Sequence, residues 1–149
     1  MTSFSHRLPR QGGFTLLEIL IVVAIIAILA AVVVPKIVGR VDDAQISKVK
    51  SDIKALEAAL DLYRLDNFQY PSTEQGLEAL VAKPSGEPEP RNYPAGGYIK
   101  RLEKDPWGRD YQYLNPGEHG DVDIFSLGAD GQLGGEGLNA DIGNWEGAE

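Results

Sequence analysis

Two parts of this sequence carry groups that could do chemistry, and in both the groups are carboxylates. The first is Glu18, near the start of the apolar run "GGFTLLEILIVVAIIAILAAVVV" at residues 12–34. The second is the pair Asp130 and Asp141, at either side of the Gly-rich stretch in "SLGADGQLGGEGLNADIGNW". A charge inside hydrocarbon costs roughly 2.5–3.5 kcal/mol or more, so Glu18 needs a cationic partner or solvent. Carboxylates and carbonyls on a flexible loop are the oxygen ligands that calcium prefers.

The residues of the Gly-rich stretch leave two interpretations open. Glycines let such a loop fold inward around an ion, but the spacing does not fit an EF-hand. Two solvated aspartates in turns explain the composition at least as well. The formal net charge is -8, and every Lys and Arg lies at or before Arg109. This acidic C-terminal part disfavours nucleic acid as a partner and favours metal ions or basic partners.

No group of residues indicates an enzyme. The sequence has no Cys, which excludes disulfides and thiolate chemistry. Of the two His residues, His6 precedes the apolar run, and His119 stands in the turn "PGEHG" without a nucleophile or a second His beside it. Trp107 and Trp145 fit core aromatic positions in a small domain better than a ligand site.

The apolar run predicts a membrane helix over residues 14–34. As a helix it measures about 31 Å, which matches a bilayer core. Arg7 and Arg10 precede it without any acidic residue, and a basic flank places this end on the cytoplasmic side. Unlike a secretory signal, the run has its small residues, Gly12 and Gly13, before the apolar segment rather than after it.

The stretch "GGFTLLE" resembles the processing site of the type IV pilin and type II secretion pseudopilin superfamily. The resemblance implies that a prepilin peptidase removes residues 1–13 by cutting between Gly13 and Phe14, and that Phe14 is then N-methylated. It also implies that Glu18 pairs with the Phe14 amine of a neighbouring subunit during assembly. A buried ion pair of this kind recovers much of the desolvation penalty of its charges. The alternative is a Glu18 solvated by water and headgroups near the membrane interface.

The rest of the chain predicts a helix followed by a small mixed head. Pro35 is expected to kink the helical pattern. An amphipathic helix then extends to about residue 65, with its apolar stripe at Ile46, Val49, Ile53, Leu56, Leu60 and Tyr63. A short helix follows, capped by Ser72 or Thr73, with an apolar face at Leu77, Leu80 and Val81, and it ends at Pro84. "YIKRL", "DYQYLN" and "DVDIFSLG" predict three antiparallel strands, although the buried face of the last does not follow from its pattern.

Nearly the whole chain resembles the major pseudopilins of type II secretion. The motifs that carry this resemblance include "YRLDNFQYPSTEQGLEALV", "GGYIK", "DPWG", "PGEHGDVDIFSLGADG" and "ADIGNW". One departure is Glu103, where the family commonly has Pro. The resemblance implies an α+β fold, with a long N-terminal helix packed on a small head that contains a short helix and a three-stranded antiparallel sheet. It divides the chain into a leader (1–13), a transmembrane segment (14–34) and a periplasmic domain (35–149). It also implies calcium in the Gly-rich loop, bound by Asp130, Asp141 and the Leu127 carbonyl, with Gln132 as a carbonyl donor and Asn139 as a further candidate.

By the same resemblance, the function is that of a structural subunit. The chain is anchored by a single pass in the bacterial inner membrane, with its head in the periplasm, and it polymerises into a helical filament that supports export of folded proteins across the outer membrane. The implied partners are other copies of the chain, minor pseudopilins, prepilin peptidase, an inner-membrane platform protein and an assembly ATPase, with no nucleic acid. Two alternatives remain: the major pilin of a type IV pilus, and a membrane-anchored calcium-binding module that does not polymerise.

Overall fold

The computed structural model describes residues 13–145 and, within them, leaves out the side chains of residues 32–40. The expected leader, apart from Gly13, therefore lies outside the described residues. The element order is α1 (Leu16–Asn67), η1 (Leu77–Leu80), β1 (Gln112–Leu114), β2 (Asp123–Ser126), η2 (Gly137–Asn139) and β3 (Ile142–Gly143). The chain divides into two compact units, one up to Arg40 and one from Val41 onward.

The first unit holds the N-terminal part of α1. Its large apolar side chains, such as Ile21, Ile25 and Leu29, are exposed in the single chain. Among the residues whose side chains the structure describes, no helical stretch is both long and apolar enough to cross a membrane. The expected span, residues 14–34, runs into residues 32–40, whose side chains belong to the part left out. The backbone is helical through Pro35, so the helix does not end there.

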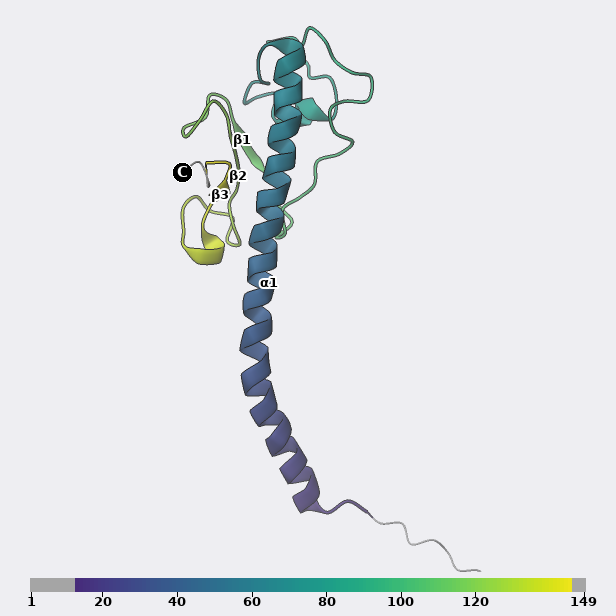
Figure 1. The fold of residues 1–149 in the computed structure, drawn as a ribbon, viewed down its shortest axis with the longest axis vertical. Coiled ribbons are helices and arrows are strands. Elements are labelled where there is room, and N and C mark those ends of the chain that lie inside the picture. The colour runs from purple at the N-terminus through teal and green to yellow at the C-terminus, as the bar shows by residue number, and fades with distance from the viewer. Residues whose placement is uncertain (1–12, 146–149) are drawn as a thin grey trace, which may run out of the picture. The chain divides into compact units, whose positions relative to one another are not determined.

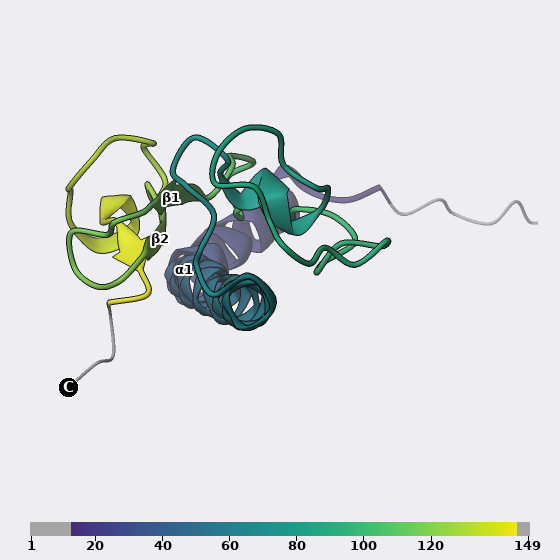
Figure 2. The same ribbon diagram turned by 90° about the horizontal axis from the view of Figure 1, so that it is seen from above.

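The second unit is built on the amphipathic part of α1, and the predicted stripe is confirmed. Val49, Ile53, Leu56, Leu60 and Tyr63 are buried in the core, and Ile46 packs against it. This is the result expected when apolar residues recur every three or four positions. The sheet and η1 flank the C-terminal part of α1 at different positions around it (Figures 1 and 2).

Two features end the helix: its last residue, Asn67, has a buried side chain, and the next residue, Phe68, has a left-handed backbone conformation. The Asn67 side chain donates to the Tyr63 carbonyl and the Tyr98 hydroxyl and accepts the Asn92 N–H. Phe68 follows with a φ of 62°, and its N–H donates to the Arg64 carbonyl. A left-handed residue after the last turn is a common helix end, but glycine usually supplies it.

The short helix is present but differs in detail from the prediction. It is a 3-10 helix over Leu77–Leu80, and Val81 lies after it. Ser72 exchanges hydrogen bonds with Gln75, so it stabilises the preceding turn and does not cap η1. Leu77 and Leu80 are buried as predicted.

The α+β class and the three-stranded antiparallel sheet are confirmed, but one strand was assigned wrongly. The sheet order is β1-β2-β3, and both pairings are antiparallel. Residues 98–102 are not a strand, because the Tyr98 and Ile99 N–H groups both donate to the Leu80 carbonyl and so tie this segment to η1. The third strand is instead Ile142–Gly143, which pairs with Phe125 and Ser126. All of β2 is buried, and this explains why its sequence shows no single apolar face.

Candidate functional site

Glu18 has a polar partner within its own chain. The Thr15 N–H donates to Glu18 Oε2 (2.8 Å), and so does the Thr15 hydroxyl (3.0 Å). The Glu18 N–H donates back to the Thr15 hydroxyl (3.2 Å). This reciprocal arrangement is a capping box, which satisfies donors at the start of a helix. The Thr-x-x-Glu spacing of "TLLE" is the sequence signal of a capping box, but it was not among the predictions.

Glu18 therefore has a role before any assembly, as the carboxylate that caps α1. Gly13 and Phe14 precede the helix and are exposed. Cleavage between them, and pairing of Glu18 with the Phe14 amine of a neighbour, stay predictions. The two roles of Glu18 are compatible, because a carboxylate offers about four lone-pair sites.

The Gly-rich loop is held by its own turns. Asp130 Oδ1 accepts the Gln132 N–H (3.0 Å), and the Leu127 carbonyl accepts the Gly131 N–H (3.2 Å). The backbone of Asn139 passes close to Gly128 and Gly135, where a Cβ atom would lie within 3 Å of backbone atoms. Both glycines also have φ values in the left-handed region, at 62° and 93°. Glycine is therefore required at these two positions for the loop to close.

Asp141 differs from Asp130 in its surroundings. Its Oδ2 accepts the Gly134 N–H (2.8 Å), but its Oδ1 is buried and has no hydrogen-bond partner among the residues that the structure describes. Asp141 and Leu127 line one open cavity of about 610 Å³, together with Phe125 and Trp145. Buried oxygens without a protein partner are rare, and a cation is one group that could satisfy this one.

The five predicted calcium residues are thus only partly brought together. Leu127 and Asp141 share the cavity, whereas Asp130, Gln132 and Asn139 are not among the residues that line it. Within the described part of the chain, no three His, Asp or Glu side chains gather at metal-binding distance. An ion in this loop would need backbone carbonyls to complete its shell, as calcium sites often use.

The first residues of the Gly-rich loop are fixed by a cationic side chain from outside the loop. The Arg109 guanidinium donates to the carbonyls of Gly128 (2.9 Å) and Ala129 (3.1 Å). The loop itself contains no Lys or Arg, and its sequence did not predict this contact because Arg109 lies well before it in the chain. The bonds go to carbonyls, so Arg109 fixes the loop without pairing with either aspartate.

The position of Arg109 depends on Asp105, which is 4% exposed. Asp105 Oδ1 accepts the N–H groups of Trp107 (3.0 Å) and Arg109 (2.8 Å). Its Oδ2 accepts the hydroxyl of Ser126 (2.7 Å), whose oxygen in turn accepts the Gly128 N–H (3.3 Å). Hydrogen bonds to a carboxylate are stronger than neutral ones, so this buried network links the "DPWG" turn to the start of the loop.

His119 makes structural contacts with Asp123 and Trp145. Its Nδ1 is 2.9 Å from Asp123 Oδ2, and its ring stacks on Trp145 at 4.0 Å. Asp123 is 1% exposed. Burial alone would raise the pKa of Asp123, but hydrogen bonds from the His119 ring and from the N–H groups of Glu118 and His119 bring it below its ordinary value. Trp107 packs against the core, as predicted.

Comparison with known proteins gives concordant results over nearly the whole chain. The family described as "Type II secretion system (T2SS), protein G" matches residues 36–145, and the "Prokaryotic N-terminal methylation motif" matches residues 8–34. Type II secretion system core protein G of Vibrio cholerae is 63% identical over 139 residues, which are 93% of this chain and 94% of that protein. The corresponding protein of Pseudomonas aeruginosa is 59% identical and covers 92% of this chain and 96% of its own length.

A solved structure is similar as well. The crystal structure of the major pseudopilin from the type 2 secretion system of enterohaemorrhagic Escherichia coli is 60% identical in sequence, with a TM-score of 0.67. The similarity covers 76% of this chain and 96% of that one.

Proposed function

This chain belongs to the type II secretion system protein G family, and on that basis we propose that it is the structural subunit of a periplasmic pseudopilus. The observation that carries this proposal is the extent of the similarity, which includes both the methylation motif and the head. The exposed apolar side chains of the N-terminal part of α1 support it, because they have no covering in the single chain. In a filament, packing against other copies would remove that surface from water.

We further propose the route by which the subunit enters the filament. A prepilin peptidase cuts after Gly13 and methylates Phe14, and residues 14–34 anchor the product in the inner membrane with the head in the periplasm. A platform protein and an assembly ATPase then add subunits, together with minor pseudopilins. Removal of two Arg and no acidic residue makes the formal charge of -8 more negative by two, so mature subunits repel one another except where local contacts oppose it.

Calcium in the Gly-rich loop is part of the same proposal. The buried, unpartnered Oδ1 of Asp141 supports it, because a cation would satisfy that oxygen. Asp141, Asp130 and the carbonyls of Leu127 and Gln132 would hold the ion, with Asn139 as a further ligand. The bound ion would supply positive charge between carboxylates that otherwise repel. Arg109 and the Asp105 network would hold the loop entry in place for it.

The experiment is complementation. The chain is produced in a bacterium whose type II secretion system lacks its own protein G, and both exported protein and sheared filaments are measured. We expect secretion and filaments from the wild type and neither from Glu18→Ala, although Glu18→Ala should still be cleaved. If the wild type is processed and stable but produces no filaments, the chain is not a filament subunit. Membrane-extracted protein that still carries residues 1–13 would overturn the route proposed for its maturation.

A further inference from the structure

Exposed apolar and basic side chains lie together at the C-terminal end of α1. Leu65 is 72% exposed and Phe68 78% exposed, and the Arg91 guanidinium lies 6.0 Å from the Phe68 ring centroid. Phe68 has a φ of 62°, which bulky residues seldom adopt. Glycine or asparagine would take this backbone conformation with less strain. The backbone of Phe68 is therefore strained although its ring is exposed to solvent and adds little to the core. Residues with strained backbone angles cluster at functional sites.

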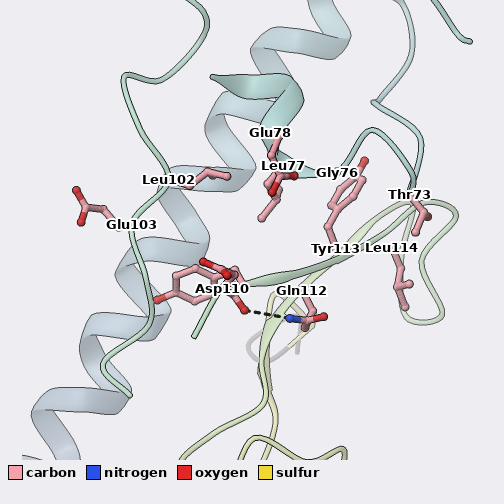
Figure 3. A pocket seen from close by; sticks show the side chains of 11 residues that line it. Thr73, Gly76, Leu77, Glu78, Leu102, Glu103, Asp110, Gln112, Tyr113 and Leu114 are labelled. Carbon is pink, nitrogen blue, oxygen red and sulfur yellow. Dashed lines mark hydrogen bonds between the residues drawn. The ribbon is translucent and has the colours of Figure 1, made fainter. Parts of the chain in front are cut away.

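A surface of complementary chemistry lies elsewhere on the same head. It is a pocket of about 370 Å³ whose lining residues come from the segments 73–78, 102–103 and 110–114, which include parts of η1 and all of β1 (Figure 3). Leu77, Leu102 and Leu114 form its apolar part. Three carboxylates also line it: Glu78, Glu103 and Asp110.

The carboxylates of this acidic pocket are unequally paired. Glu103 forms an ion pair with Arg101, and Asp110 forms one with Lys104 at 2.9 Å. Glu78 has neither an ion pair nor a side-chain hydrogen bond to any residue that the structure describes, and it is exposed. A cation from another molecule can therefore reach Glu78 without displacing an existing partner.

We propose that Phe68 and Arg91 of one subunit dock into the acidic pocket of a second copy, with the ring against Leu77 and Leu102 and the guanidinium facing Glu78. The proposal rests on the proposed function, since it requires many copies in one filament. Two different surfaces of the same chain meet in this contact, so it can repeat from copy to copy along an open helix, as a filament requires. The contact also places the Arg91 cation against the Glu78 carboxylate. This local attraction between opposite charges opposes the repulsion between two negatively charged subunits and favours a second copy of the chain over a partner without such a cation.

Cross-linking tests the contact directly, because the natural sequence has no Cys. Full-length chains with Leu65→Cys, which keeps Phe68 and Arg91, with Gln112→Cys, an exposed position that lines the pocket, or with both are assembled into filaments and treated with a short bis-maleimide. The double variant should give a ladder of dimers, trimers and larger species, and each single variant should remain monomeric. Dimers from Leu65→Cys alone would mean that the surface around Phe68 meets the same surface of another copy, and cross-links only to other proteins would mean a different partner. Either result overturns the proposal.

Charge reversal and strain relief provide independent readouts. Arg91→Glu and Glu78→Arg should each reduce the filament yield roughly tenfold, as expected for loss of one central interfacial pair, and the double reversal should restore it. Phe68→Gly should also reduce filaments while leaving the melting temperature of the protein equal or higher, because glycine accepts the φ of 62°. A loss of filaments accompanied by a lower melting temperature would assign Phe68 to the fold and not to docking.

The wild type separates failure of this proposal from failure of the function. Wild-type filaments without a ladder from the double-Cys variant would refute the docking contact alone. Absence of filaments from the wild type under the same conditions would refute the proposed function instead.

Discussion

Calcium should decide whether the wild type or the Asp141→Asn variant is the more stable protein. We expect the variant to be more stable with chelator and the wild type to be more stable with calcium. Without calcium, the wild type buries a charged oxygen, Asp141 Oδ1, that has no partner. Leaving such a group unsatisfied costs about 1–3 kcal/mol. Asparagine can keep its carbonyl on the Gly134 N–H and place a neutral amide where the charged oxygen was. The variant should therefore be about 1 kcal/mol more stable than the wild type when a chelator is present.

With calcium the order inverts. An ion that binds only the folded form at a hundredfold excess over its Kd adds about 2.7 kcal/mol. For a head of this size that corresponds to an increase in the melting temperature of roughly 10 °C. Asp141→Asn lacks the charged ligand and should not respond. Magnesium should replace calcium poorly, because it requires near-octahedral geometry.

The assay is thermal melting of the full-length protein in detergent, followed by circular dichroism, with chelator, calcium or magnesium. Asp121→Asn is the matched control: Asp121 is an exposed aspartate outside the loop that pairs with Arg64, and its replacement should change neither the melting temperature nor the calcium response appreciably. A wild type that melts at the same temperature with chelator and with calcium would refute the reasoning. So would an Asp141→Asn variant that responds to calcium as the wild type does.

Three further predictions concern the cap of α1, the Asp105 network and the pair of His119 and Asp123. Thr15→Val should weaken the cap of α1 by about 1 kcal/mol, seen as faster amide exchange in its first turn. Glu18→Ala should speed exchange in the same turn, and filaments at the wild-type level from Glu18→Ala would mean that this carboxylate only caps the helix. Asp105→Ala should lower the free energy of unfolding by about 3–5 kcal/mol in denaturant titrations, because it leaves several buried donors without an acceptor, and a loss below 1 kcal/mol would contradict that account. The pKa of Asp123 is lowered on folding, so its contribution to stability is present above the ordinary aspartate pKa of about 3.9 and is lost as pH falls through the lower folded value. His119→Ala removes one of its donors and should move acid unfolding to higher pH in urea titrations between about pH 2 and 6, whereas an unchanged acid transition would show that the backbone donors suffice.

The parts of the fold that were predictable from sequence depend on local repeats. The apolar stripe of α1 follows from its three- and four-residue spacing, and burial of Val49, Ile53 and Leu60 confirms it. The short helix near Leu77 and the strands near Tyr113 and Ile124 were found because turn residues bound each of them. These signals need no knowledge of distant residues.

The errors have a common physical cause. Residues 98–102 have strand-like composition, but their backbone donors bond to the Leu80 carbonyl. Ile142–Gly143 is too short to show any period, and it becomes a strand only because β2 offers it an edge. Whether a short segment pairs in a sheet depends on which edge is available, and the segment itself does not encode that.

For the candidate site, the sequence by itself determined the reactive groups and the local devices: Glu18 three residues after Thr15, an acidic Gly-rich loop, and the motifs that identify the family. Only the tertiary structure decided their surroundings. It brought Arg109 to the Gly128 carbonyl, left Asp141 Oδ1 buried without a partner, and exposed Phe68 in a strained conformation. A capping box joins residues one turn apart, so helix formation alone creates it. Burial and long-range hydrogen bonds depend on which distant segments the hydrophobic core draws together, and that is a property of the whole packed chain.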